Sequence, residues 1–133
     1  MHTSSRLAAV ALLIALGAAG CGGGTTTPTG SSSTAVGIAG GNLGTPGVVI
    51  DANDQNKFVP ETQSVTVGEI IEWKNVGKVG HNIVFADADA QSLNDPVLAA
   101  GGVWEVKFTQ PGTYNYTCTI HIAMDGTIVV GSS

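Results

Sequence analysis

Short runs of alternating apolar and polar residues dominate the C-terminal two thirds of the chain. Residues 48–52 are rich in β-branched side chains, and residues 63–75 alternate on either side of Gly68. Residues 81–86 and 103–109 continue the pattern. Alternation with a period of two is typical of a strand that buries one face. These runs therefore predict strands separated by turns.

The run at residues 103–109 alternates most clearly. It divides into an apolar face and a face with two charges: Trp104, Val106 and Phe108 against Val103, Glu105 and Lys107. A turn at "PG" leads into a strand that ends at Cys118, and residues 126–131 form the last strand. The pattern predicts an all-β protein, either an antiparallel sandwich or a barrel.

Residues 87–102 ("DADAQSLNDPVLAAGG") interrupt the rhythm. This segment is interpreted as one long loop or a short helix. Asp95 followed by proline is typical of a helix start, which places one helical turn over residues 96–100.

The N-terminal segment has the pattern of an export signal. An apolar run at residues 7–20 is too short to span a membrane and has the length of a signal-peptide core. Its ending, "GAAGC", resembles a bacterial lipoprotein signal, although Ala18 stands where leucine is usual. Residues 1–20 are then removed and Cys21 is acylated. The alternative is an ordinary cleaved secretory signal with an incidental cysteine.

Composition divides the remainder into a tether and a domain. Residues 21–45 are mostly Gly, Thr and Ser, a composition typical of a flexible tether, and the folded domain is predicted at residues 46–133. The expected location is the extracytoplasmic side of a bacterial cell envelope, with the protein lipid-anchored to a membrane. A net charge of −5 makes nucleic acid an unsuitable partner.

The segment "CTIHIAM" places Cys118, His121 and Met124 at even three-residue steps. Taken singly, a cysteine in a strand is commonly a small buried apolar residue, a loop histidine can satisfy a local hydrogen bond, and methionine fills cores. Their joint occurrence at a strand end indicates a metal site instead.

The available ligands favour copper over other metals. Structural zinc prefers four firm ligands, often several thiolates, and an iron–sulfur cluster needs about four cysteines or a Rieske mixture. One thiolate, two imidazoles and a weak axial thioether form the ligand set of a blue copper site. His81 must supply the second imidazole, because the only other histidine, His2, lies in the signal.

Other functions compete with electron transfer. A cysteine protease would need an exposed nucleophile and an oxyanion hole, and copper oxidases need further histidines, so the chain is expected not to be an enzyme. A copper delivery or storage module remains the main alternative function. A structural surface module with an incidental metal is a second.

With these residues assembled, residues 46–131 resemble the cupredoxins, the plastocyanin and amicyanin group of type 1 blue copper proteins. "GHNIVF" is similar to the stretch with the first histidine ligand, and "GTYNYTCTIHIAM" to the stretch with the other three. The resemblance implies an all-β fold, a Greek-key β-sandwich of about seven to eight strands. It also implies that one copper ion is bound by a set of four ligands: His81, Cys118, His121 and Met124.

The resemblance also implies a role for Asn82, which would tether the cysteine loop by hydrogen bonds. It implies a monomeric one-electron carrier that shuttles between redox partners: a cytochrome, or a photosynthetic, oxidase or dehydrogenase complex. Ile120 and Ile122 depart from the family, which often has proline before the loop histidine and, in amicyanin, after it. This departure bears on the reduction potential.

Overall fold

A computed structural model describes residues 34–133 of the chain. The predicted signal, Cys21 and most of the predicted tether lie outside the described residues. No helix within residues 34–133 is long and apolar enough to cross a membrane.

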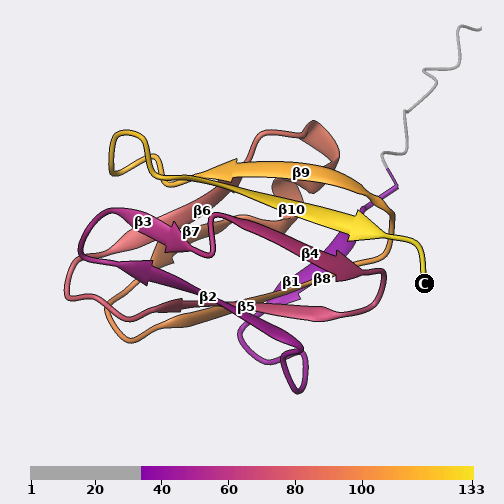
Figure 1. The fold of residues 1–133 in the computed structure, drawn as a ribbon, viewed down its shortest axis with the longest axis horizontal. Helices are drawn as coiled ribbons and strands as arrows, with labels where there is room; N and C mark the ends of the chain where they lie inside the picture. The colour runs from indigo at the N-terminus through magenta and orange to yellow at the C-terminus, as the bar shows by residue number, and fades with distance from the viewer. Residues whose placement is uncertain (1–33) are drawn as a thin grey trace, which may run out of the picture. The chain divides into compact units, whose positions relative to one another are not determined.

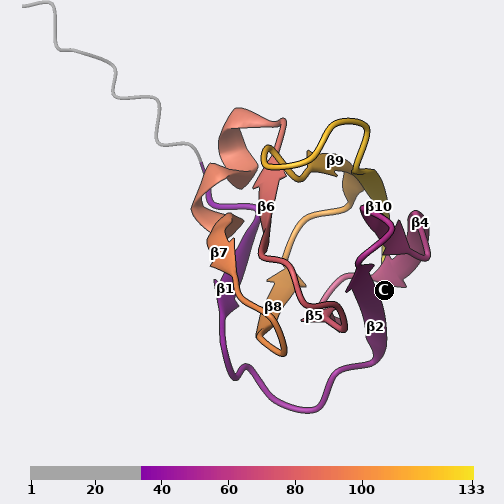
Figure 2. The same cartoon turned by 90° about the vertical axis from the view of Figure 1, so that its left-hand side faces the viewer.

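Two five-stranded sheets pack face to face, and Figure 2 shows them end on. The first sheet has the order β1 (Gly37–Gly40), β8 (Val103–Phe108), β5 (Ile70–Asn75), β2 (Val48–Asn53) and β3 (Lys57–Val59). The second has the order β4 (Thr62–Thr66), β10 (Asp125–Gly131), β9 (Gly112–Thr117), β6 (His81–Phe85) and β7 (Asp95–Leu98). The predicted all-β sandwich is thus confirmed.

The sheets are mixed rather than purely antiparallel. Strand β2 pairs with β5 in parallel, and β4 pairs with β10 in parallel, whereas the other pairings are antiparallel. The chain crosses repeatedly between the sheets, so that the consecutive strands β4, β5 and β6 alternate between the two layers. The prediction of antiparallel sheets is therefore wrong for these two pairs.

The described residues contain ten strands, more than the seven to eight predicted. The additional strands are short edge elements, among them β1, which occupies residues that the sequence assigns to the tether. Strand β1 pairs with β8, and Val36 just before it is buried. A Cβ on Gly37 would lie 2.7 Å from the carbonyl oxygen of Lys107, so glycine permits this close pairing. Residues 36–40 are therefore part of the folded domain, which begins before the predicted boundary at residue 45.

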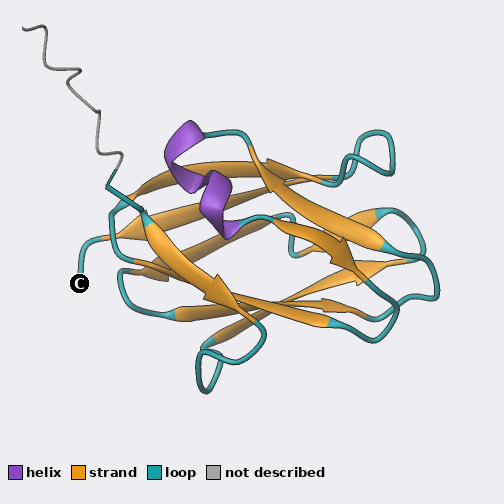
Figure 3. Cartoon of the chain, turned by 180° about the vertical axis from the view of Figure 1, so that it is seen from behind, coloured by secondary structure: helices purple, strands orange, loops and turns teal. Residues whose placement is uncertain are grey.

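The segment 87–102 contains both a helix and a strand. A 3-10 helix, η1, spans Ala88–Leu93, and Figure 3 shows it against the otherwise β-rich chain. The predicted helical turn after Asp95 is wrong, because residues from Asp95 onward form β7 and pair with β6. The Asp95 carboxylate instead accepts a hydrogen bond of 3.1 Å from the backbone N–H of Val97.

Asp95 provides a test of how burial affects stability. Burial raises the pKa of this carboxyl above 3.8, partly offset by the hydrogen bond from Val97. The folded protein thus holds the proton more tightly than the unfolded chain, and stability falls as the pH rises through the folded pKa. Asn at this position keeps an acceptor oxygen and cannot ionise.

We therefore expect Asp95→Asn to be more stable than the natural chain at neutral pH. The difference should disappear at a pH below 3.8, where Asp95 is protonated in both states. Urea unfolding at the two pH values measures this difference. An equal gain in stability at both would show that ionisation of Asp95 is not its cause.

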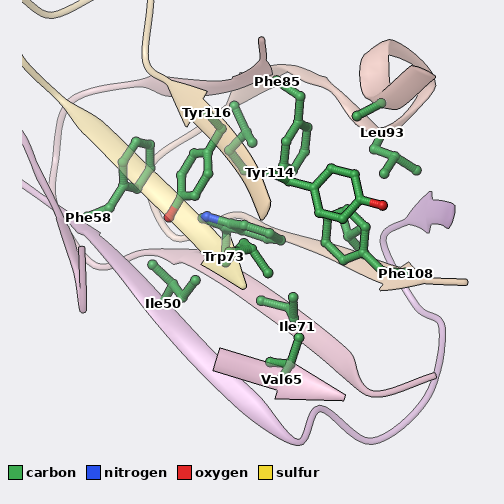
Figure 4. Packing of buried hydrophobic residues seen from close by; sticks show 14 of the residues in the cluster. Ile50, Phe58, Val65, Ile71, Trp73, Phe85, Leu93, Phe108, Tyr114 and Tyr116 are labelled. Carbon is green, nitrogen blue, oxygen red and sulfur yellow. The ribbon is translucent and has the colours of Figure 1, made fainter. Parts of the chain in front are cut away.

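The core lies between the two sheets and is rich in aromatic side chains (Figure 4). Trp73, Phe85 and Tyr116 contact one another edge-on or tilted, with ring centroids 5.3–6.1 Å apart. Phe108 contacts Phe85 and stacks on Tyr114 at 4.4 Å. Such geometries suit the ring quadrupoles and add to the burial of apolar area. Because Tyr116 lies in β9, this core holds the strand that leads to Cys118.

Candidate metal centre

The first component of the site is His81, the opening residue of β6. It follows a loop whose conformation is held by Asn75, the side chain of which donates hydrogen bonds to the carbonyls of Val79 and Leu98. The register between β6 and β7 is irregular between His81 and Ile83. His81 is fully buried. The start of the strand thus projects an imidazole into the end of the sandwich.

The second component is the loop between β9 and β10, which lies at one end of the sandwich (Figure 1). Cys118 follows β9 directly and is 1% exposed, and the loop returns to the sheet at Met124, which is fully buried. The backbone N–H of Cys118 donates to the carbonyl of Met124 at 2.8 Å. This bond closes the loop across its base.

The structure brings His81, Cys118 and His121 together. The Sγ atom of Cys118 lies 3.9 Å from Nδ1 of His81 and 3.6 Å from Nδ1 of His121. One potential ligand atom from each residue lies within 4.8 Å of the others. The two imidazole rings are tilted with centroids 4.8 Å apart. The three side chains named from the sequence therefore converge on one point.

The environment of His81 favours a neutral imidazole. Burial lowers the pKa of His81, and the nearby His121 lowers it further, while Asp54 and the backbone of Asn53 act in the opposite direction. A neutral ring offers a free lone pair, which a metal ligand requires. His81 is therefore held in the protonation state that binds metal.

Asn82 and Thr119 connect β6 to the loop by a reciprocal pair of hydrogen bonds. The backbone N–H of Thr119 donates to Oδ1 of Asn82, and Nδ2 of Asn82 donates to the hydroxyl of Thr119, both at 2.8 Å. These bonds fix the residue after Cys118 relative to the residue after His81. Sequence reasoning missed Thr119, because a threonine beside a cysteine in a strand-like run has no distinguishing pattern.

One edge of the site faces solvent. His121 is half-buried, whereas His81 and Cys118 are buried. Ile122 is 98% exposed and Ile120 is 56% exposed, so apolar side chains flank the accessible imidazole. His121 is thus the most accessible of these three side chains, and its neighbours in the loop expose apolar surface.

The donor set fits copper. The sulfur and the two Nδ1 atoms are close enough to share one ion, and the thioether of a buried methionine ends the same loop. A single thiolate with two imidazoles leaves zinc without its usual fourth firm ligand, whereas a copper site of this kind is completed by a weak axial thioether.

Comparisons with known proteins agree with this assignment. Residues 47–131 match the family described as "Copper binding proteins, plastocyanin/azurin family". Amicyanin-alpha of Methylorubrum extorquens is 33% identical over 76 residues, covering 56% of this chain and 64% of that protein. Plastocyanin of Scenedesmus fuscus is 37% identical over 83 residues, covering 55% of this chain and 85% of that protein.

A solved structure has the same fold. The Cu(I) form of a methionine-to-glutamine mutant of amicyanin superposes with a TM-score of 0.58 at 30% identity, covering 64% of this chain and 83% of that one. The match in sequence spans most of the described strands and both components of the site. The chain therefore belongs to the plastocyanin/azurin family of copper-binding proteins, the cupredoxins, and its cofactor is copper.

Proposed function

We propose that the protein is a one-electron carrier and not an enzyme. Four residues hold its copper ion: His81, Cys118, His121 and Met124. The observation that supports this most strongly is the convergence of Sγ of Cys118 with the two Nδ1 atoms in a buried position. The bound copper supplies the chemistry by alternating between Cu(II) and Cu(I).

The protein's own contribution is a rigid frame for the ligands. Burial keeps His81 neutral, the Asn82–Thr119 pair holds the two ligand-bearing segments together, and the bond from Cys118 to Met124 closes the loop. Ligands held in this way move little when the charge of the ion changes, so little energy is spent on reorganisation. Asn82 thus acts by orienting the loop rather than by contacting the ion.

The accessible edge of His121 is the proposed route for the electron. Ile120 and Ile122 surround this edge with exposed apolar surface. A small apolar contact suits the brief association of a redox complex. The partners are redox proteins of the cytochrome, photosynthetic, oxidase or dehydrogenase classes.

Export and anchoring complete the proposal. The apolar run at residues 7–20 and the "GAAGC" ending support cleavage before Cys21 and its acylation. The copper domain would then work on the extracytoplasmic side of a bacterial envelope, as a monomer joined to the membrane by its N-terminal tether.

Copper loading of the purified protein tests the function. Addition of Cu(II) should produce an intense blue colour from thiolate-to-copper charge transfer. A reductant should bleach the colour, and an oxidant should restore it fully in the same sample, with copper retained after gel filtration in both states. A sample that loses copper on reduction would instead support copper delivery, and a colourless one would contradict the ligand assignment.

A further inference from the structure

The carbonyl of Met124 accepts hydrogen bonds from two consecutive residues of the chain. The backbone N–H of Cys118 donates at 2.8 Å, and the hydroxyl of Thr117 donates at 3.2 Å. The same hydroxyl lies 3.5 Å from the carbonyl of Cys118, at the limit of a hydrogen bond, so Met124 is its better acceptor. Thr117 is half-buried at the end of β9, beside the first residue of β10.

The loop has a structural reason to need this second bond. Ile122 is 98% exposed and Met124 is fully buried, so the chain must turn inward within two residues. Ala123 makes the turn in the left-handed region at φ 57°, which is strained for a residue other than glycine. Such a conformation persists only where neighbouring contacts hold it, and the contacts at the carbonyl of Met124 follow it directly.

We propose that Thr117 is a positioning residue for Met124, the thioether of which would be the fourth ligand of the bound copper. Its hydroxyl and the N–H of Cys118 both donate to the carbonyl oxygen of Met124. A single hydrogen bond would leave the peptide plane after Met124 free to rotate, whereas two donors restrict that rotation. The backbone of Met124 is thereby fixed, and with it the approach of the thioether to the ion. This inference rests on the proposed ligation by Met124.

The chemical consequence concerns the balance between the two copper states. The potential of a site with this ligand set depends on the axial ligand. A thioether that is less firmly held donates more weakly to the ion. This change removes more stabilisation from Cu(II) than from Cu(I) and therefore raises the reduction potential. Thr117 therefore keeps the reduction potential lower than the loop alone would set it.

Thr117→Val tests the proposal, because valine keeps the branched shape and removes the hydroxyl. The potential of the variant should rise, and the relative intensities of its charge-transfer bands should change. Copper should leave the variant roughly 2- to 12-fold faster, the factor that corresponds to one neutral hydrogen bond. In the copper-free protein, the amide of Cys118 should exchange its hydrogen faster, since its acceptor is less firmly held.

Two controls separate this effect from a general loss of structure. Thr117→Ser keeps the hydroxyl and should restore the natural spectrum and potential. Thr127→Val removes a comparable hydroxyl, which donates to the side chain of Asn115 on the same pair of strands rather than to the carbonyl of Met124. That variant should leave the spectrum, the potential and the exchange of the Cys118 amide unchanged.

A natural spectrum, potential and release rate in Thr117→Val would overturn the proposal. Where valine prevents folding, Thr117→Ala and Thr117→Ser provide the comparison, and equal potentials in these two would also overturn it. Met124→Leu tests the underlying ligation separately. An unchanged spectrum in that variant would contradict the ligand set itself, whereas a changed one, with Thr117→Val unaffected, would contradict only the role of Thr117.

Discussion

Replacing Cys118 with serine is expected to abolish the blue colour of the copper-loaded protein completely. The colour arises from charge transfer between thiolate sulfur and Cu(II), and a serine hydroxyl is neither a soft donor nor ionised at neutral pH. Sγ of Cys118 also lies close to both imidazoles, 3.6 and 3.9 Å from the two Nδ1 atoms. Retention of copper after gel filtration should be lost with the colour.

Two measurements make this result specific. Visible absorption with added Cu(II) reports the charge transfer, and circular dichroism of the copper-free variant reports whether the fold is retained. Cys21→Ser is the matched control, because it makes the same chemical change outside the copper domain and should keep the colour. A blue Cys118→Ser protein would show that the thiolate is not the ligand.

The second large effect concerns stability. Phe85 is fully buried in β6 and contacts the rings of Trp73, Tyr116 and Phe108. Phe85→Ala removes this central contact and leaves a cavity, so we expect the free energy of unfolding to fall by about 3–5 kcal/mol. That loss is a large fraction of the total for a small domain, about 5–15 kcal/mol.

Urea unfolding of the copper-free proteins measures this effect. Val97→Ala is the control, because Val97 lies in the neighbouring strand and is 69% exposed, and its truncation should change stability by less than about 0.5 kcal/mol. The loss of unfolding free energy in Phe85→Leu should lie between the losses in Phe85→Ala and Val97→Ala. A loss of less than 1 kcal/mol in Phe85→Ala would mean that the aromatic cluster does not hold the sheets together to the extent that its burial indicates.

The long strands could be predicted because each carries its own alternating pattern. The runs that become β5 and β10 bury their alternate residues over five or more positions, so local sequence suffices. Strands β1 and β7 could not be predicted. Both lie at sheet edges, and the glycines of β1 and the proline of β7 give no such pattern. The pairing of β1 also depends on β8, which is distant in sequence.

Glu105 shows a similar limit. Alternation places it opposite Phe108, on the outer face of the sheet, and that assignment predicts exposure. In the structure Glu105 is only 5% exposed, and the backbone N–H of Leu43 donates to its carboxylate. The chain before β2 thus contacts the outer face of the sheet, a contact between residues far apart in sequence.

The convergence of His81, Cys118 and His121 could be predicted because copper chemistry leaves few choices. Two histidines and one cysteine remain in the domain, and the spacing of the loop places three candidates in one turn. The hydrogen bonds that hold the group could be predicted only in part. The resemblance to cupredoxins indicated Asn82, whereas Thr117 and Thr119 are ordinary strand residues whose roles depend on where the loop returns.

A crystal structure of the copper-loaded protein, with the metal located by anomalous scattering at the copper edge, tests the central claim most directly. We expect a single anomalous peak bonded to Sγ of Cys118 and to Nδ1 of both His81 and His121, with the Met124 sulfur on the axial side at a longer distance. A peak elsewhere, or an imidazole of His81 turned away from the metal, would contradict the electron-carrier proposal.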